Sequence, residues 1–284
     1  MLEPGLYLVA TPIGNLEDIT LRALRVLKSV DRIACEDTRE TQKLLHHFDI
    51  STPTVSYHEH NERSRTAELI LDLQNGGSIA VVSDAGTPAF SDPGVELVRA
   101  ALAAGIRVFP IPGANAALSA LVASGLNTDS FVYLGFLPSR PGQRRTQLET
   151  LAAHPSGQTL IVYEAPHRIL DTLADVEGVW GGSVCVVIAR ELTKLHEEFL
   201  RGTVADVRGE LSGRDRIRGE IVLLIAATPP AQALESNMSI ARLITHLIAT
   251  EGLEEKEALK RVARERGVSK SDVYRELQRE RSRR

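Results

Sequence analysis

The chain has 284 residues, of which 43% are hydrophobic and 25% charged, a composition that excludes a disordered chain. This length suggests one large or two medium domains. The net charge of -4 gives no global basic signal, but residues 1–235 carry 21 basic and 29 acidic side chains and residues 236–284 carry 12 and 8. A basic tail favours a polyanionic partner, although solvated helix surfaces have the same composition.

The cysteine content and the apolar runs indicate a compartment. Cys35 and Cys185 lie far apart and form no metal-type spacing, which favours a reducing cytosol. The N-terminus has no basic region typical of a signal peptide, and the longest strongly apolar stretch, Ile221–Ala227, is too short to span a bilayer. We therefore expect a cytoplasmic protein with no membrane partner.

Short β-branched runs alternate with helical patterns, which predicts βαβ units and a mainly parallel sheet. In the first half the predicted strands are Leu6–Ala10, Arg32–Cys35, Thr54–Tyr57, Ile79–Ser83 and Arg107–Ile111. Helices are predicted over Thr20–Val30, Asn61–Asn75 and Pro93–Ala104, the last with proline in its first turn.

The second half continues with a short helix, Ala116–Ser124, and further strands, two of which come close together and suggest a mixed sheet. The predicted strands are Phe131–Phe136, Thr159–Tyr163, Val184–Ala189, Glu197–Leu200 and Ile221–Ala226, with a helix over Ala205–Leu211. We predict an N-terminal α/β domain over residues 1–112, a second over 113–230, and a basic helical extension over 231–284.

The extension begins after Thr228-Pro229-Pro230, since two prolines cannot continue a strand or helix interior. Its apolar residues form two helical stripes that stop at Gly252 and Gly267, and Ser269-x-x-Asp272 then marks a further helix start. The first stripe consists of Ile240, Leu243, Ile244, Leu247 and Ile248. This outline resembles a helix-turn-helix, and a three-helix cap on the body fits it equally well.

Ligands of open α/β sheets bind beyond the carboxyl ends of the strands, and four strand ends here carry glycine, proline or clustered charge. These loops are Thr11–Asn15, Glu36–Arg39, Asp84–Pro88 and Pro112–Asn115. Together they predict one composite pocket. No P-loop or G-x-G-x-x-G fingerprint is present, and the loops are not basic, which argues against a bound polyphosphate. Their carboxylates suit ribose hydroxyls or a cationic centre.

The loops resemble those of the tetrapyrrole methylase superfamily. The stretches that carry the resemblance are VATPIGNLEDIT, ACEDTRET, SDAGTPAFSDPG, IPGANAALSAL, GFLPSR, YEAPHRI and RELTKLHEE, in order between Gly5 and Ala227. More closely, these stretches resemble the superfamily's ribosomal RNA methyltransferases, which methylate the ribose 2′-oxygen of a cytidine in the decoding region of small-subunit (16S) RNA. The resemblance implies two α/β domains with a cofactor cleft between them, a helical extension, and a homodimer.

The resemblance also implies S-adenosylmethionine as cofactor, with small-subunit ribosomal RNA or the 30S particle as partner. The positions that match the superfamily's cofactor contacts, with their loop neighbours, are Pro12, Ile13, Gly14, Asp84, Ala85, Gly86, Ala89, Asn115, Ala116, Glu164 and Gly202. Asp84 stands where the superfamily often has glycine, so the resemblance carries over the loop and its place at the cofactor but not the exact contact of this side chain.

Basic side chains near the cleft could bind RNA phosphates, and we assign this role to Arg39, Arg168, Arg190 and Lys194. An intramolecular network of arginines and glutamates is the alternative. We predict no metal, because His58 and His60 have no third ligand at a recognisable spacing.

A ribose hydroxyl is a weak acid, so a base or a hydroxyl-positioning group should face the cleft. The candidates by position are Glu36, Asp37, Glu164, His167 and Glu191. We favour Asp37 narrowly over His167, and an Asp37–Arg39 pair that only shapes the loop is the alternative. Two other functions also stay open: methylation of a tetrapyrrole or other small molecule, and RNA binding in ribosome assembly without catalysis.

Overall fold

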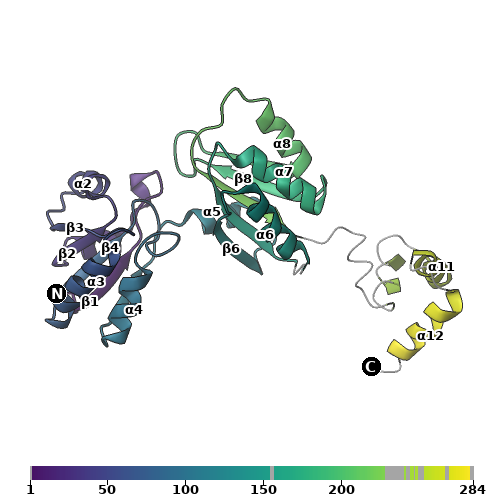
Figure 1. Cartoon of the computed structure of the whole chain (residues 1–284), viewed down its shortest axis with the longest axis horizontal. Coiled ribbons are helices and arrows are strands. Elements are labelled where there is room, and N and C mark those ends of the chain that lie inside the picture. Colours follow the sequence, from purple (N-terminus) through teal and green to yellow (C-terminus); the bar gives the residue numbers. More distant parts are fainter. Residues whose placement is uncertain are drawn as a thin grey trace.

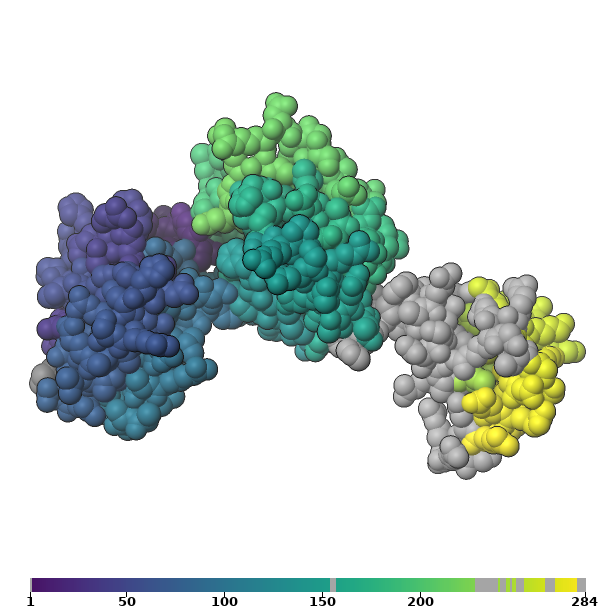
Figure 2. Space-filling view, in the orientation of Figure 1, coloured from purple at the N-terminus to yellow at the C-terminus, as the bar shows by residue number. Residues whose placement is uncertain are grey.

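The computed structural model describes residues 2–153, 157–227, 240, 244–245, 247–248, 253–265 and 269–281. Within them the chain forms two five-stranded sheets, one from each half of the body. Figure 1 shows the first sheet with α2, α3 and α4, and beside it the second sheet with α6, α7 and α8. In the space-filling view a notch separates the purple-blue part from the teal part (Figure 2).

The first sheet has the strand order β3-β2-β4-β1-β5, and all neighbouring strands are parallel. Its strands are β1 (Gly5–Val9), β2 (Arg32–Cys35), β3 (Thr54–Ser56), β4 (Ser78–Val82) and β5 (Val108–Ile111). The helices between them are α1 (Leu21–Leu27), α2 (Thr38–His47), α3 (Glu62–Gln74) and α4 (Val95–Ala103), with a 3-10 turn at Leu16–Asp18. Because the strands are parallel, the loops after them meet at one edge.

Helices cover both faces of this sheet, as strands with near-continuous apolar sequences require. On one face, Val26 and Leu27 of α1 and Leu45 of α2 are buried against the strands. On the other face, Leu69 of α3 and Leu97 of α4 are buried in the same way. The helices therefore hold the sheet rigid and leave its carboxyl edge open.

The second sheet is mixed, as the sequence predicts, and has the strand order β6-β7-β10-β8-β9. Strands β6 and β7 are parallel, whereas β10 is antiparallel to β7 and β8, and β9 to β8. The strands are β6 (Phe131–Phe136), β7 (Thr159–Glu164), β8 (Cys185–Arg190), β9 (Glu198–Thr203) and β10 (Ile221–Ala226). The helices are α5 (Ala116–Ser124), α6 (Pro141–Ala153), α7 (Ile169–Trp180) and α8 (Val204–Ser212).

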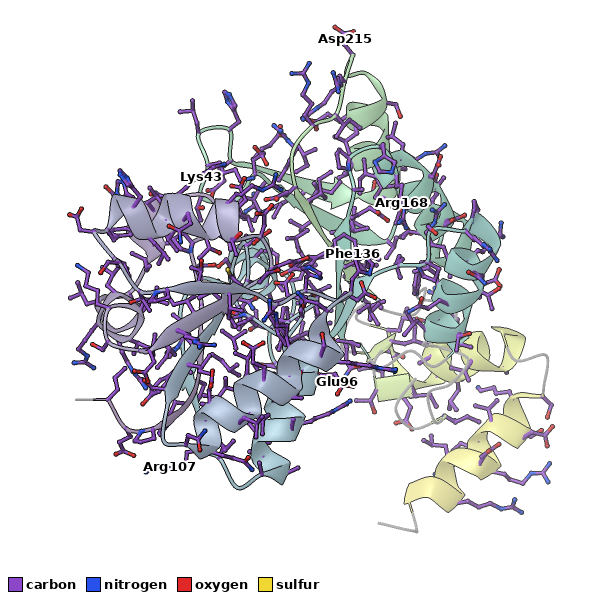
Figure 3. All side chains as sticks on the ribbon, turned by 60° about the vertical axis from the view of Figure 1, so that its left-hand side comes forward. Lys43, Glu96, Arg107, Phe136, Arg168 and Asp215 are labelled. Atoms are coloured by element: carbon purple, nitrogen blue, oxygen red, sulfur yellow. The ribbon has the colours of Figure 1, made fainter. Side chains whose placement is uncertain are left out.

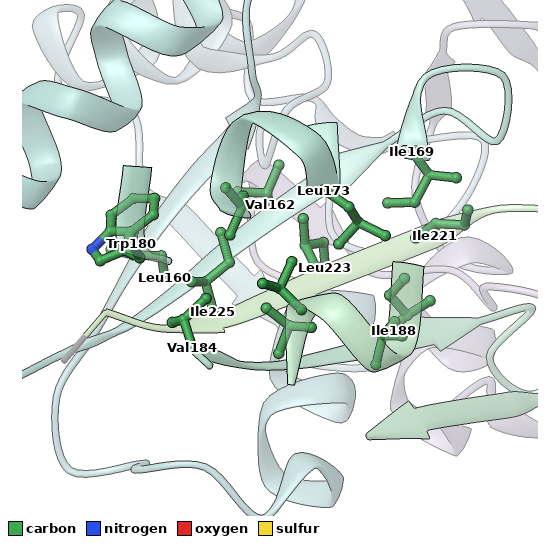
Figure 4. Close-up of a cluster of buried hydrophobic side chains, with 14 of the residues drawn as sticks. Leu160, Val162, Ile169, Leu173, Trp180, Val184, Ile188, Ile221, Leu223 and Ile225 are labelled. Atoms are coloured by element: carbon green, nitrogen blue, oxygen red, sulfur yellow. The ribbon is translucent and has the colours of Figure 1, made fainter. Parts of the chain in front are cut away.

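The two faces of the second sheet are covered differently. On one face α6, α7 and α8 enclose a core that includes Leu173, Trp180 and Leu223, part of which Figure 4 shows. On the other face lies α5, together with Ile13 and Phe90 from loops of the first sheet. The first half of the chain thus packs directly on the second sheet.

The confirmed elements include β2, β6, β10 and α5, whose bounds coincide with the predicted ones. Two predictions at helix starts are wrong. Helix α4 begins at Val95, after Gly94 at φ 131°, so Pro93 precedes its first turn. The loop predicted over Glu36–Arg39 is shorter, because Asp37 caps α2 and Arg39 lies in that helix. The domain boundary after residue 112 stays a prediction, and the boundary after residue 230 lies outside the described residues.

The C-terminal helices α11 (Glu255–Glu265) and α12 (Lys270–Arg281) have a core of their own. The Ser269 hydroxyl accepts a hydrogen bond from the Asp272 N–H at 3.2 Å, which confirms the predicted helix start. From the first predicted stripe, Ile240, Ile244 and Leu247 are buried in this core, whereas Ile248 is exposed and Leu243 lies outside the described residues. Among the described residues, none of the helices combines the length and the apolar character that crossing a membrane requires.

Replacing Leu223 by alanine tests the core of the second sheet. Leu223 is fully buried in the central strand β10, so we expect the substitution to lower the free energy of unfolding by about 2–5 kcal/mol. Urea denaturation measures the change. The matched control is Leu71→Ala on α3, where the leucine is 61% exposed. Equal losses in both variants would contradict the assigned core.

Candidate functional site

Two loops at the carboxyl edge of the first sheet are joined by backbone hydrogen bonds. The Thr11 N–H donates to the Gly86 carbonyl at 2.8 Å, and the Gly86 N–H donates to the Thr11 carbonyl at 3.1 Å. The Thr11 hydroxyl also donates to the Ser83 carbonyl at 3.0 Å. Gly86 has φ 85°, and a Cβ there would lie 3.2 Å from Ile13. Glycine is therefore required where the two loops meet.

The other two predicted loops are attached to this pair. The Thr87 hydroxyl donates to the Ala114 carbonyl at 3.2 Å, and the Asn115 amide donates to the Thr87 hydroxyl at 3.3 Å. The Asp37 N–H donates to Asp84 Oδ1 at 3.2 Å. All four strand-end loops that the sequence singled out are thus brought together, as predicted.

The loop after β4 reaches across to β6 of the second sheet. The hydroxyls of Ser91 and Tyr133 are 2.6 Å apart, and the rings of Phe90 and Tyr133 stack with centroids 4.0 Å apart. A Cβ at Gly135 would lie 3.1 Å from Ser91 Oγ, so glycine permits the close approach. Ser91 itself has φ 65°, which a non-glycine residue adopts at a cost.

Between these loops and the second sheet lies a cavity of about 390 Å³. Residues from both halves of the chain line it. The first-half residues are Ile13, Ala85, Gly86, Thr87, Phe90, Ser91 and Asp92. The others are Asn115, Ala116, Phe136, Tyr163, Glu164, Ala165, Pro166, Ala189, Leu192, Gly219, Glu220, Ile221 and Val222. The volume is typical of a small-molecule site.

The structure brings together six of the predicted cofactor positions around this cavity: Ile13, Ala85, Gly86, Asn115, Ala116 and Glu164. Pro12, Gly14 and Asp84 line a neighbouring hollow of about 220 Å³ instead. Ala89 and Gly202 line neither of these two; Gly202 lies within β9, paired with Val186. The roles of all these residues in binding stay predictions.

Glu164 is buried, and its carboxylate is bound by the protein itself. Oε2 accepts a hydrogen bond from the Thr172 hydroxyl at 2.6 Å, and Oε1 accepts one from the Ala165 N–H at 2.8 Å. Arg168 Nε lies 3.3 Å from Oε1. This carboxylate shapes the wall of the cavity, and each of its oxygens accepts a hydrogen bond from the protein.

Three of the four predicted phosphate-binding cations are held by the protein near the cleft. Arg168 Nη2 donates to the carbonyls of Leu137 and Pro138 at 2.9 and 3.1 Å. Arg190 pairs with Glu198 at 2.9 Å. Lys194 Nζ pairs with Glu191 at 2.9 Å and with Glu220 at 2.8 Å. The alternative of an intramolecular network therefore describes these contacts, and phosphate binding stays a prediction.

The fourth cation, Arg39, pairs with Asp37 through Nη2 and Oδ2 at 2.7 Å and through Nε and Oδ1 at 3.1 Å. The hydrogen bonds from Arg39 lower the pKa of Asp37 to about 2, which makes this carboxylate a weak base. Neither Asp37 nor His167 lines the cavity, and His167 is exposed in the turn before α7. Their assignment as base stays a prediction that the geometry does not favour.

The sequence reasoning missed Asp92, a half-buried carboxyl that lines the cavity. Burial and the nearby charges of Glu36 and Asp84 raise its pKa to about 6, against a lowering hydrogen bond from Ser83. Burial and Asp84 also raise the pKa of Glu36. SDPG reads as an ordinary turn, and the signal that could have found Asp92 is its place in a long loop after a predicted strand end.

The aromatic side chains of the cavity were missed as well. The ring of Tyr163 meets those of Tyr133 and Phe136 edge-on, with centroids 5.3 and 5.7 Å apart. Phe136, labelled in Figure 3, is 57% exposed at the end of β6. Within the described residues no group of three or more His, Cys, Asp or Glu side chains is placed to hold a metal ion.

Residues 5–208 match the family described as Tetrapyrrole (Corrin/Porphyrin) Methylases. The chain is 52% identical over 273 residues to a protein of Halalkalibacterium halodurans named Ribosomal RNA small subunit methyltransferase I, across 95% of this chain and 93% of that one. A protein of the same name from Bacillus subtilis is 45% identical over 274 residues, across 95% and 92%.

Solved structures share the fold at lower identity. The uroporphyrin-III C-methyltransferase of Thermus thermophilus has a TM-score of 0.55 at 21% identity, over 79% of this chain and 95% of that one. A structure of such an enzyme from the same organism with S-adenyl homocysteine has a TM-score of 0.55 at 17% identity, over 78% and 98%. Diphthine synthase has a TM-score of 0.57 at 12% identity, over 78% and 89%.

Proposed function

The chain belongs to the tetrapyrrole (corrin/porphyrin) methylase family and, within it, to the family of the ribosomal RNA small subunit methyltransferase I proteins, and on this premise we propose that it methylates a cytidine ribose 2′-oxygen of small-subunit ribosomal RNA with S-adenosylmethionine. The observation that carries the proposal is the cavity where the joined loops after β1, β4 and β5 face the second sheet. The names of the relatives support small-subunit ribosomal RNA as the substrate. Methylation at the 2′-oxygen of a cytidine is the more specific part of the proposal.

The residues of the cavity fit a nucleoside-based methyl donor. Gly86, Ala116, Ala165 and Ala189 are small, so the backbone can approach a flat base closely. The volume of about 390 Å³ lies in the usual range for small ligands. When bound, S-adenosylmethionine supplies a methyl group already activated by a positively charged sulfur, and carboxylates around the cavity favour that charge.

The protein has three tasks in this reaction. It must hold the donor and the ribose oxygen in line, exclude water, and accept the hydroxyl proton. The loops that would hold the donor are fixed by the Thr11–Gly86 hydrogen bonds and by the Asn115–Thr87 contact. The rings of Phe90 and Tyr163, which line the cavity, help to exclude water.

We propose that the basic residues 236–284 contribute to holding the RNA, because lysine and arginine supply phosphate affinity without regard to sequence. Helices α11 and α12 place part of this charge on a separate apolar core. The cytoplasmic location and the homodimer belong to the same proposal and stay predictions.

Methylation of purified 30S particles tests the function. We expect the protein, with labelled S-adenosylmethionine, to transfer label to particles that lack the modification, and mass spectrometry of nucleosides to find 2′-O-methylcytidine. Naked RNA and a tetrapyrrole acid are assayed in parallel. Label on the tetrapyrrole would support the small-molecule alternative, and RNA binding without any transfer would support a role in assembly alone.

Replacing Ala116 by tryptophan tests the donor pocket. Ala116 lines the cavity at the start of α5, so a large ring there should fill the space and weaken donor binding at least tenfold. Calorimetry with S-adenosylmethionine measures it. Val122→Trp is the matched control, since Val122 is 75% exposed on the same helix. Unchanged affinity in the Ala116 variant would remove this loop from the pocket.

A chain that ends at residue 230 tests the extension. We expect it to bind the donor normally and to methylate 30S particles poorly at low salt, and we expect its RNA affinity to fall less steeply with salt than that of the full chain, because fewer phosphate contacts remain. Donor calorimetry and methylation at two salt concentrations measure both properties. If the shortened chain folds and keeps full activity, the extension is a cap and does not bind RNA.

A further inference from the structure

Three carboxylates line the cavity: Asp92, Glu164 and Glu220. Glu164 is engaged by Thr172 and Arg168, and Glu220 pairs with Lys194. In the described part of the chain Asp92 has no basic partner. A carboxylate whose lone pairs are not committed to a cation can accept a proton from a ligand.

The residues that line the cavity also fall into two groups according to the loops and strands that carry them. The predicted donor positions account for six lining residues, and these come from the strand-end loops and from Glu164 at the end of β7. Among the other lining residues, Phe90, Ser91 and Asp92 belong to the loop after β4, and Tyr163 and Phe136 contribute aromatic rings that meet edge-on. Aromatic faces suit an unstacked nucleic-acid base, which is how proteins read single-stranded RNA. Asp92 is thus a lining residue outside the predicted donor positions, in a part of the lining that can take the acceptor nucleotide.

The backbone fixes where Asp92 lies. The neighbouring Ser91 has φ 65° and its hydroxyl is bound to that of Tyr133, while Gly94 at φ 131° starts α4. The Gly94 N–H donates to Glu62 Oε1 at 3.4 Å. The backbone at Asp92 is therefore held between two anchored residues, which keeps this residue in the wall of the cavity.

From these contacts, and resting on the proposed function, we propose that Asp92 binds the acceptor ribose hydroxyl and takes its proton during methyl transfer. The 2′-oxygen forms a bond to the methyl carbon as the carbon–sulfur bond breaks, and the sulfur keeps that electron pair. The hydroxyl proton passes to the Asp92 carboxylate and then to water. The products are the 2′-O-methyl ribose and a neutral thioether.

The charged and titratable groups that face Asp92 come from several elements. Glu36 follows β2 and Asp84 follows β4, while Tyr133 and Tyr163 belong to β6 and β7. Together with burial, the two acids raise the pKa of Asp92 to about 6. Since the base must be ionised, the rate should fall as pH drops through about 6.

Two measurements test the proposal in the full-length protein. The first is carbon NMR titration of the ligand-free protein: we expect a carboxyl with a pKa of about 6 that disappears in Asp92→Asn. In Glu36→Gln this pKa should fall, because one negative charge is removed. The second is single-turnover methylation of 30S particles at saturating donor, between pH 5 and pH 9.

We expect Asp92→Asn to slow the single-turnover step about 100-fold or more and to remove its acid limb, while donor affinity stays unchanged. Asp92→Glu should recover part of the rate. Glu36→Gln should move the acid limb to lower pH. The matched control is Glu96→Gln, an exposed carboxylate on α4 (labelled in Figure 3), which should leave both the rate and the profile unchanged.

The outcomes separate this proposal from the proposed function. If the unmodified protein methylates no RNA, the function itself is wrong. If it methylates RNA and Asp92→Asn keeps its rate and its pH profile, the assignment of Asp92 is overturned. Asp37→Asn and His167→Ala are assayed beside it, and a loss of the acid limb confined to either variant would overturn the assignment in favour of that residue.

Discussion

Two backbone hydrogen bonds between Thr11 and Gly86 join the loops that leave β1 and β4, and the other features of the site depend on this junction. The contact positions Ile13 against Gly86 and leaves Thr87 free to bind the loop after β5. Backbone groups in such loops must find partners when they leave the sheet. Here the backbone groups of the two loops bond to each other. The loops at the edge of the parallel sheet therefore form a fixed wall although they contain little secondary structure.

The second sheet forms the other wall of the cavity, and its two faces are covered to different extents. Three helices bury one face completely, whereas α5 and a few side chains from the first half cover only part of the other. The cavity lies over the part of that face that these groups leave uncovered. The junction of Ser91 with Tyr133 sets how near the first half stands to the second. Cavity volume and loop contacts are therefore coupled.

Much of this arrangement could be predicted from sequence, because alternating apolar runs and helical spacings determine elements such as β6, β10 and α5 locally. The parallel order then predicts that four loops meet. What pattern alone could not supply was the pairing of long side chains. Arg190 and Lys194 look like phosphate ligands in sequence, yet Glu198 on β9 and Glu220 before β10 reach them from other parts of the chain. Asp92 was missed because its environment is made by distant acids.

Arg168 joins two parts of the scaffold. Its guanidinium reaches the carbonyls of Leu137 and Pro138, where the chain leaves β6, and also the buried carboxylate of Glu164 at the end of β7. A guanidinium spreads its donors over three nitrogens in a rigid plane, whereas lysine offers a single compact ammonium, so lysine is no equivalent substitute at this position. The sequence YEAPHR is thus a signature of this strand junction. Finding it in another chain would indicate a shared framework and would not, by itself, indicate a shared substrate.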